Sequence, residues 1–313
     1  MRVLLLYPDL AKYRPAGYDR AWAGALRELG CEVDVMAAAP DAWARSGPPA
    51  GRWDLVVPHV LIEDVVEFGP GLRAAAVLEA SGAALLNPVS AIVASSDKLV
   101  THAVWAAHGL AQPRTWALDS LERWPVADGA ELVLKPAWGD GARHLACVGS
   151  LAAARAAVEG WCADERRGGE SRGPALVQER IAEPVCSRIF ATPHRTSMVY
   201  EKQRRPGALV THGTVYAAVR DPPAAVADLA RAAVAALGGG LMGIDLLTSE
   251  HGDPLALEAN APFGFDVTDP EQGRFVARAA IEMARRGTGV LDSLSAVEAG
   301  GASPPLPATA VPV

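Results

Sequence analysis

The sequence predicts an α/β chain that starts with a doubly wound parallel layer and continues with an α+β part built from two subdomains. Two observations carry this prediction. Up to about residue 95, short apolar runs of strand length alternate with helical runs, which is typical of parallel sheets with helices packed on their faces. Beyond that point, strand-like runs follow one another with only turns between them, as in antiparallel sheets.

The first 95 residues are predicted to form one domain with four strands and two helices. The helices end at Gly30 and Gly82, where a residue that tolerates a positive φ commonly closes the last turn. Strands are expected at 2–7, 31–37, 53–58 and 85–88, and helices at 20–29 and 71–81.

The remaining chain is predicted to form two subdomains, 96–177 and 178–295, and a flexible tail at 296–313. The tail is rich in Pro, Ala, Gly and Ser, a composition that does not support a packed core. Helices are expected at 98–108, 152–162, 222–237 and 274–286. Strands are expected at 132–136, 144–148, 175–181, 188–191, 197–202 and 215–219, and in a hairpin that holds 243–247 and 257–260.

The composition predicts a soluble cytoplasmic protein without a nucleic-acid or membrane partner. The net charge of the 313 residues is −7, whereas binding to nucleic acid needs an excess of Lys and Arg. No window approaches the ~20 apolar residues of a membrane-spanning helix, and the N-terminal apolar run is too short for a signal peptide. The four cysteines lack the paired spacing of a metal site and predict reduced thiols.

The hairpin near the C-terminus is the most informative feature for function. Asp245 lies in its first strand, and Glu258 and Asn260 lie in its second. Residues two apart on a strand share a face, so Glu258 and Asn260 point the same way, and Asp245 can join them if the strands pair. Carboxylates at strand ends often simply face water. Inside apolar runs, however, an unpaired carboxylate is costly, which favours a Mg²⁺ site made of three oxygen ligands.

Two lysines and one strand end suggest a nucleotide. Lys135 ends an apolar strand before the glycine-rich loop 137–141, whose backbone amides could close over phosphates. Lys98 begins a helix after a typical N-cap run, where the helix dipole disfavours a cation unless an anion binds. The strand that ends in 177–183 offers backbone groups to an adenine ring. Taken singly, each feature also fits an exposed lysine or an ordinary strand end.

A basic cluster lies on the predicted antiparallel strands. Its members are Arg188, Lys202, Arg204 and Arg205. These cations could stabilise a transferring phosphate group or bind a substrate carboxylate. Surface charge is the alternative interpretation of each.

The order of these motifs resembles that of the ATP-grasp superfamily, in particular the branch of glutathione synthetase and the RimK-type amino-acid ligases. The resemblance covers residues 95–285, and the first 95 residues fit the family's preceding domain only in general shape. The matching segments are Ser96-Asp97-Lys98-Leu99, Val133-Leu134-Lys135-Pro136, Val177-Gln178-Glu179, Gly243-Ile244-Asp245 and Leu257-Glu258-Ala259-Asn260.

The resemblance implies a role for each matching residue. Lys98 and Lys135 would contact the phosphates of ATP. The adenosine would lie against Gln178, Glu179, Arg180 and Ile181, with Glu183 as the candidate for the ribose. Asp245, Glu258 and Asn260 would bind Mg²⁺, as two ions for which Mn²⁺ can substitute. Arg188, Lys202 and Arg204 would be the catalytic cations that stabilise the transferring charge.

The activity that the resemblance implies is an ATP-dependent ligation of a carboxylate to an amine through an acyl phosphate. The substrates would be small and amino-acid-like, and the two groups could belong to two molecules or to one that cyclises. The enzyme would be a homo-oligomer, either a dimer or a tetramer. Two alternatives stay open, namely a degenerate nucleotide-binding regulatory protein and a phosphotransferase that stops at phosphoryl transfer.

The sequence departs from the family pattern where the substrate should bind. Gly243 stands where D-alanine–D-alanine ligases have an arginine, and Cys186 and Ser187 stand where many relatives have an acidic residue. The segments 211–214 and 261–264 also differ from the family pattern. On the N-terminal side, Asp9, Arg14 and His59 follow predicted strands, where doubly wound layers usually bind ligands.

Overall fold

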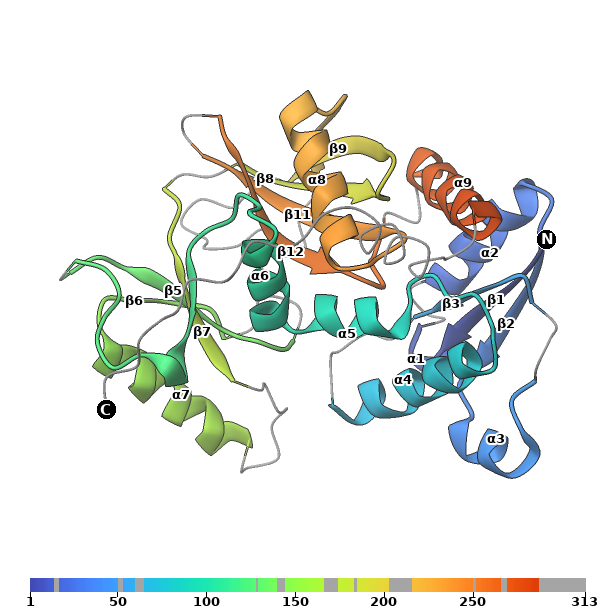
Figure 1. The fold of residues 1–313 in the computed structure, drawn as a ribbon, viewed down its shortest axis with the longest axis horizontal. Helices are drawn as coiled ribbons and strands as arrows, with labels where there is room; N and C mark the ends of the chain where they lie inside the picture. The colour runs from blue at the N-terminus through green and yellow to red at the C-terminus, as the bar shows by residue number, and fades with distance from the viewer. Residues whose placement is uncertain are drawn as a thin grey trace, which may run out of the picture.

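The computed structural model describes residues 1–13, 17–49, 53–59, 65–127, 129–139, 144–165, 174–182, 185–202, 216–249, 252–265 and 269–286. Within these ranges the strands form three sheets that lie along the longest axis of the molecule, and the sheet built from residues 185–260 lies between the other two (Figure 1). None of the helices in these ranges is both long and apolar enough to cross a membrane.

The N-terminal sheet is parallel, as predicted. Strand β1 (Arg2–Tyr7) lies between β2 (Glu32–Ala37) and β3 (Leu55–Pro58). Alternate side chains of β1 enter two different cores. Leu5 packs with α2 (Tyr18–Glu28), while Leu4 packs with α3 (Pro40–Ser46) and α4 (Val65–Ala80). The short α1 (Leu10–Tyr13) follows β1. Helices therefore cover both faces, and the doubly wound layer is confirmed.

The strand predicted at 85–88 is wrong as a full strand. Only Leu85 pairs, through a single parallel bridge to Val56. The chain then turns at Pro88 into α5 (Val89–Ser96), a helix that the sequence analysis did not anticipate. Proline cannot donate a ladder hydrogen bond, and the side chain of Asn87 instead bonds to a distant backbone segment.

The second sheet is antiparallel and has the strand order β4-β7-β5-β6. Helix α7 (Leu151–Glu165) packs on one face around Leu134 and Val177. The strands are β4 (Thr115–Ala117), β5 (Leu132–Pro136), β6 (Ala146–Val148) and β7 (Ala175–Glu179), and a 3₁₀ turn occupies Leu118–Ser120.

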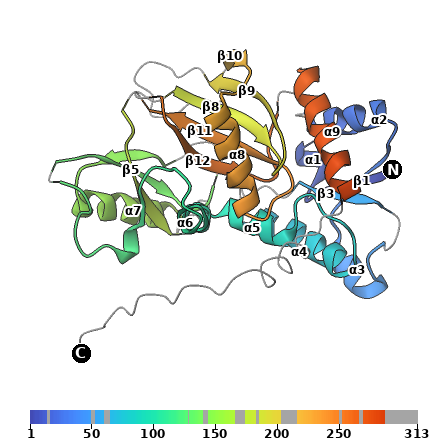
Figure 2. The ribbon, with the colours of Figure 1, turned by 45° about the horizontal axis from the view of Figure 1, so that its top comes forward.

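The third sheet carries the predicted hairpin and has the antiparallel order β10-β9-β8-β11-β12. Helix α8 (Ala224–Ala236) lies across it (Figure 2), with Ile244 and Leu246 beneath. The strands are β8 (Val185–Ala191), β9 (Thr196–Lys202), β10 (Tyr216–Arg220), β11 (Met242–Thr248) and β12 (Pro254–Asn260).

Strand β7 belongs to the second sheet, and the next strand, β8, belongs to the third. The change of sheet therefore comes after Glu179, whereas the predicted subdomain boundary at 177/178 falls inside β7. The full division into domains stays a prediction.

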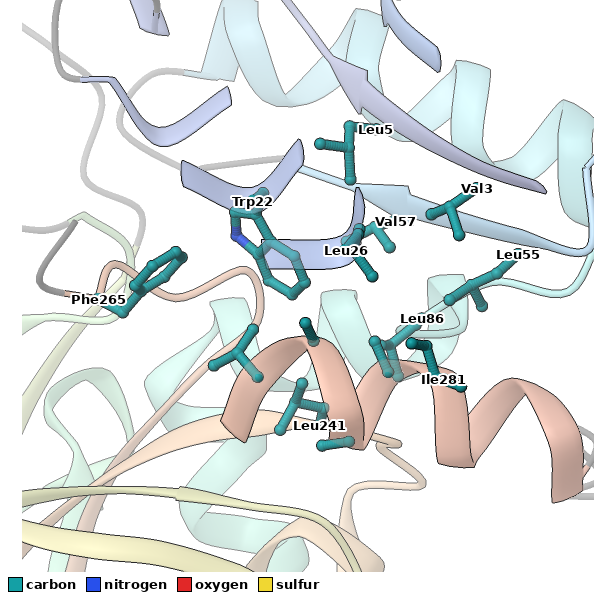
Figure 3. Packing of buried hydrophobic residues seen from close by; sticks show 14 of the residues in the cluster. Val3, Leu5, Trp22, Leu26, Leu55, Val57, Leu86, Leu241, Phe265 and Ile281 are labelled. Atoms are coloured by element: carbon teal, nitrogen blue, oxygen red, sulfur yellow. The ribbon is translucent and has the colours of Figure 1, made fainter. Parts of the chain in front are cut away.

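The N-terminal layer and the third sheet share one hydrophobic core. The last described helix, α9 (Pro270–Arg286), returns to pack on α2. Figure 3 shows Trp22 and Leu26 of α2 near Ile281 of α9, with Leu241 close by. Buried Asn87 adds a polar link, because its carboxamide accepts from the N–H groups of Gly240 and Leu241 and donates to the Leu241 carbonyl, at 2.7–2.9 Å. This link lies just before the strand that carries Asp245.

Candidate active site

Three charged residues form a row across the third sheet. Arg188 of β8 lies directly opposite Asp245 of β11, which lies directly opposite Glu258 of β12. Directly opposed residues share a face, and the neighbouring positions Ile244 and Ala259 belong to the apolar core under α8. The alternation predicted for the hairpin is therefore confirmed, and it places the charges on the face away from α8.

Asp245 is held by two cations. Arg188 donates to both carboxylate oxygens, each at 2.8 Å, and Nζ of Lys202 lies 2.9 Å from Oδ1. Burial leaves Asp245 5% exposed and by itself raises its pKa, but the charges and hydrogen bonds of Arg188 and Lys202 outweigh burial and lower the pKa to about 2. Asp245 is therefore an anion at neutral pH, and the predicted catalytic cations Arg188 and Lys202 are its partners.

Lys98 joins the glycine-rich loop to the hairpin. It begins α6 (Lys98–Ala107), and its Nζ donates to the Gly139 carbonyl at 2.8 Å and lies 3.2 Å from Oε1 of Glu258. Asp97 caps the helix through Oδ1 and accepts from the Trp138 indole through Oδ2, at 2.8 Å. The first residues of the loop are therefore fastened to the N-terminus of α6, beside the predicted metal ligands.

Lys135 lies buried at the end of β5. It is 7% exposed, and its Nζ donates to Oε1 of Gln178 at 2.8 Å. Burial, opposed by the charge of Glu258 and assisted by the charge of Lys98, lowers the pKa of Lys135 to about 8. The chain has four lysines, and three of them (Lys98, Lys135 and Lys202) belong to this region.

A polar network behind Lys135 was missed by the sequence analysis. Nε2 of Gln178 lies 2.8 Å from Oγ1 of Thr115 and 2.9 Å from Nε2 of His102, and Nδ1 of His102 lies 2.6 Å from Oε1 of Gln112. The one available signal was spacing, because His102 lies four residues after Lys98 and such residues share a helix face.

The predicted adenine segment has its side chains engaged elsewhere. Glu179 accepts two hydrogen bonds from the Arg114 guanidinium at 3.2 Å, and Arg180 pairs with Glu131. Ile181 is half-buried in the connection to β8. A nucleotide here would therefore use the backbone of 180–182 more readily than these side chains.

Several predicted residues cannot be placed. Glu183, Arg204, Arg205, Arg14 and the segment 211–214 lie outside the described residues. Asp9 is exposed and caps the short α1 by accepting from the Ala11 N–H at 2.8 Å. His59, a candidate ligand-binding residue, is 6% exposed directly after β3 and stacks on Tyr7 with ring centroids 4.4 Å apart.

The three predicted metal ligands fit Mg²⁺ by the chemistry of their donors. They offer two carboxylates and one carboxamide, all hard oxygen donors of the kind that Mg²⁺ prefers. Asn260 donates through Nδ2 to the Gly243 carbonyl at 3.4 Å, which leaves Oδ1 as its remaining acceptor. No group of three or more His, Cys, Asp or Glu gathers in the described part of the chain. A metal ion bound by Asp245 and Glu258 would therefore need the Asn260 carboxamide as its third protein ligand, and the metal site stays a prediction.

An aromatic wall adjoins the charged row on the same face. A Cβ atom at Gly243 would lie 3.0 Å from Cβ of Phe263, so a larger side chain at this position would require Phe263 to shift. Trp22 approaches Phe263 and Phe265 with ring centroids 6.1 and 5.8 Å away.

His59 lies beside Trp22, with ring centroids 5.6 Å apart. Burial lowers the pKa of His59 to about 3, so its ring is neutral at physiological pH.

The chain is similar in sequence to curated ligases. It is 27% identical over 263 residues to a probable α-L-glutamate ligase of Parasynechococcus marenigrum (strain WH8102), and 26% identical over 250 residues to one of Legionella pneumophila (strain Corby). These matches cover 80% and 77% of this chain. The chain spans about half the length of the first relative (53%) and 79% of the second. No family model matches the chain.

The fold is shared with solved ATP-grasp structures. The D-cycloserine synthetase DcsG superposes with a TM-score of 0.63 at 19% identity, over 91% of this chain and 99% of that one. The ATP-grasp ligase PsnB, complexed with minimal precursor, Mg and ADP, gives 0.64 at 15% identity, over 90% and 97%. A D-alanine–D-alanine ligase from Bacillus anthracis complexed with ATP gives 0.64 at 14% identity, over 91% and 98%. The resemblance seen in the motifs is confirmed to this extent: the chain shares the fold of the solved ATP-grasp ligases, and its sequence is similar to that of probable α-L-glutamate ligases.

Proposed function

We propose that the chain is an ATP- and Mg²⁺-dependent ligase that joins a carboxylate to an amine on small amino-acid-like substrates and releases ADP and phosphate. One observation carries the proposal. The predicted phosphate-binding cation Lys98 lies 3.2 Å from the predicted metal ligand Glu258, and both act electrostatically on the buried Lys135. The predicted phosphate-binding and metal-binding residues thus lie close together, where the second and third sheets meet. The names of the curated relatives support the same reaction class.

The ion pairs suggest how ATP would enter this site. Lys98 is shared between Glu258 and the loop carbonyl of Gly139. A phosphate group that takes over Lys98 leaves Glu258 to a divalent cation, so ATP and Mg²⁺ would bind as one unit. When bound at Asp245, Glu258 and Asn260, Mg²⁺ would neutralise charge on the transferring phosphoryl group. Two ions, exchangeable for Mn²⁺, are part of the proposal.

The proposed reaction needs positioning and positive charge more than a nucleophilic side chain. A carboxylate oxygen of the substrate takes the γ-phosphoryl group, and ADP leaves. The amine nitrogen then attacks the acyl carbon and loses a proton, and the C–O bond breaks so that phosphate leaves with that oxygen. Arg188 and Lys202, already oriented by Asp245, would stabilise the charge of the transferring group.

The acceptor side differs from the family pattern, so we propose the substrate class and not one substrate. L-Glutamate is the first candidate because of the relatives' names. Gly243 and the aromatic wall at Phe263, however, replace the polar arginine of the D-alanine–D-alanine ligases with an apolar surface. Amino acids with apolar side chains therefore belong in the same panel.

The test is ADP formation from ATP and Mg²⁺ with a panel of carboxylates, with hydroxylamine as a general amine. Ligation predicts ADP together with a hydroxamate, because hydroxylamine attacks the acyl carbon of an acyl phosphate but does not react with a phosphate ester. ADP with a stable phosphorylated product would indicate a phosphotransferase. Nucleotide binding without turnover on any carboxylate would indicate a regulatory protein.

Two variants test the metal assignment. Asp245→Asn and Glu258→Gln should each lower ADP formation by about 100-fold or more, the scale at which a preorganised electrostatic group contributes. Glu282 of α9 forms a surface ion pair with Arg195. The variant Glu282→Gln is the matched control and should keep full activity. Full activity in either site variant, with thermal unfolding showing an intact fold, would overturn the assignment.

A further inference from the structure

The network behind Lys135 is buried and continuous. It links Lys135 of β5 to Gln178 of β7, then to His102 of α6, and then to Gln112 in the segment that precedes β4. Gln178 and His102 are each 3% exposed. In such surroundings a misdirected polar group is costly, so the hydrogen-bond directions are well determined.

The directions follow from the ammonium group of Lys135, which can only donate. The atom of Gln178 that faces it must therefore be the carboxamide oxygen, and Nε2 of Gln178 must donate to Thr115 and His102. Nε2 of His102 is then an acceptor and carries no proton. Nδ1 carries the proton and donates to Oε1 of Gln112, whose Nε2 in turn donates to the His102 carbonyl at 2.9 Å.

The low pKa of His102 agrees with this assignment. Burial, together with the charges of Lys135 and Lys98 and against the effects of Gln112 and Glu258, lowers the pKa of His102 to about 4. Between about pH 4 and pH 8 the His102 ring is therefore neutral while Lys135 is protonated, and Nε2 of His102 is available as an acceptor.

We propose that His102 is a positioning residue: as its neutral Nδ1–H tautomer it accepts from Gln178 and fixes the carboxamide oxygen that aims the ammonium group of Lys135 at the nucleotide phosphates. The inference rests on the proposed function, because it takes Lys135 as a phosphate ligand. Without the His102 acceptor, Thr115 alone accepts from the NH₂ group of Gln178, so the carboxamide is held by one hydrogen bond fewer and its oxygen is less firmly fixed on Lys135.

Two amide substitutions distinguish the two ring nitrogens. His102→Gln places an amide near Nε2 and can still accept from Gln178, whereas His102→Asn reaches only the Nδ1 position and keeps the contact with Gln112. Binding of a non-hydrolysable ATP analogue with Mg²⁺ is measured by calorimetry. We expect His102→Asn to weaken binding by about 10-fold, the effect of one buried hydrogen bond, and His102→Gln by less than about 3-fold.

Lys135→Met separates this inference from the proposed function. If Lys135→Met leaves nucleotide affinity unchanged, the assignment of Lys135 to the phosphates fails. If Lys135→Met weakens binding but His102→Asn and His102→Gln behave alike, the positioning role is wrong while the site stands. A purely structural role would lower the melting temperature of both His102 variants without separating their affinities.

A spectroscopic measurement on the wild-type protein keeps the inference testable should a variant not fold. Imidazole ¹⁵N resonances are recorded between about pH 5 and pH 9, and His102 is assigned by its absence in His102→Gln or by its contacts with Trp105, which lies 5.6 Å away. We expect a protonated Nδ1, a bare Nε2 and no titration. An Nε2–H tautomer or a titration in this range would overturn the inference.

Discussion

The buried ammonium group of Lys135 gives a quantitative prediction about stability. Burial lowers its pKa from 10.5 to about 8, and at about 1.4 kcal/mol per pH unit this corresponds to about 3 kcal/mol. Below about pH 8 the lysine is charged in both the folded and the unfolded protein, so the destabilisation from burying the charged ammonium group is fully present. Above about pH 8 the lysine of the folded protein loses its proton first, and this destabilisation decreases until the lysine of the unfolded protein also deprotonates near pH 10.5.

The perturbation is Lys135→Met, which keeps the length of the side chain and removes the charge. Its absolute effect on stability combines the removal of the buried charge with the loss of the hydrogen bond to Gln178, and the two oppose each other. The pH dependence separates them. Between about pH 7 and pH 10, the wild type should gain about 2.5 kcal/mol in its free energy of unfolding relative to Lys135→Met.

The assay is urea unfolding of both proteins at the two pH values without nucleotide. Other groups that titrate in alkali, such as the Cys31 thiol, are present in both proteins and cancel in the difference. If the free energies of unfolding of the two proteins change in parallel with pH, the prediction is wrong, because Lys135 would then have the same pKa in the folded and the unfolded state.

Three further predictions concern the framework around the site. Asn87→Ala leaves buried backbone N–H and C=O groups of Gly240 and Leu241 without their hydrogen-bond partner. It should lower the free energy of unfolding in urea by about 2–4 kcal/mol, and a decrease below about 0.5 kcal/mol would contradict the role of Asn87 as a link. Gly243→Ala brings a Cβ atom to 3.0 Å from Phe263 and should lower the free energy of unfolding by about 1–3 kcal/mol in the same assay. An unchanged stability would show that Phe263 can move aside without a loss of packing. Asp245, with its pKa lowered to about 2, contributes about 2 kcal/mol that is present above about pH 4 and lost as the pH falls toward 2. The difference in free energy of unfolding between wild type and Asp245→Asn should decrease by about 2 kcal/mol from about pH 4 to pH 2. A constant difference would contradict the lowered pKa of Asp245.

The elements that follow from local pattern were predictable from the sequence. Strand β1 is a continuous apolar run, and the glycines after α2 and α4 mark helix ends. The strand predicted at 85–88 failed because the apolar run ends at Leu86, and Asn87 followed by Pro88 favours a buried turn over a continued strand. Helix α5 was missed because its apolar residues show no helical periodicity strong enough to identify it.

The candidate site was predictable where one strand carries the chemistry. Glu258 and Asn260 share a strand, so alternation alone places them on one face. Arg188 could equally have been a surface charge, because its contact with Asp245 joins residues 57 positions apart through strand pairing that no local pattern encodes. The same holds for the approach of His102 to Gln178, 76 positions away.

The central claim, ligation through an acyl phosphate, is tested most directly by following one oxygen atom. The carboxylate that the substrate panel identifies is labelled with ¹⁸O and incubated with ATP, Mg²⁺ and its amine. We predict that the released phosphate carries one ¹⁸O atom for each amide bond formed. An amide product formed together with unlabelled phosphate, with the displaced ¹⁸O found in AMP or in water, would contradict ligation through an acyl phosphate.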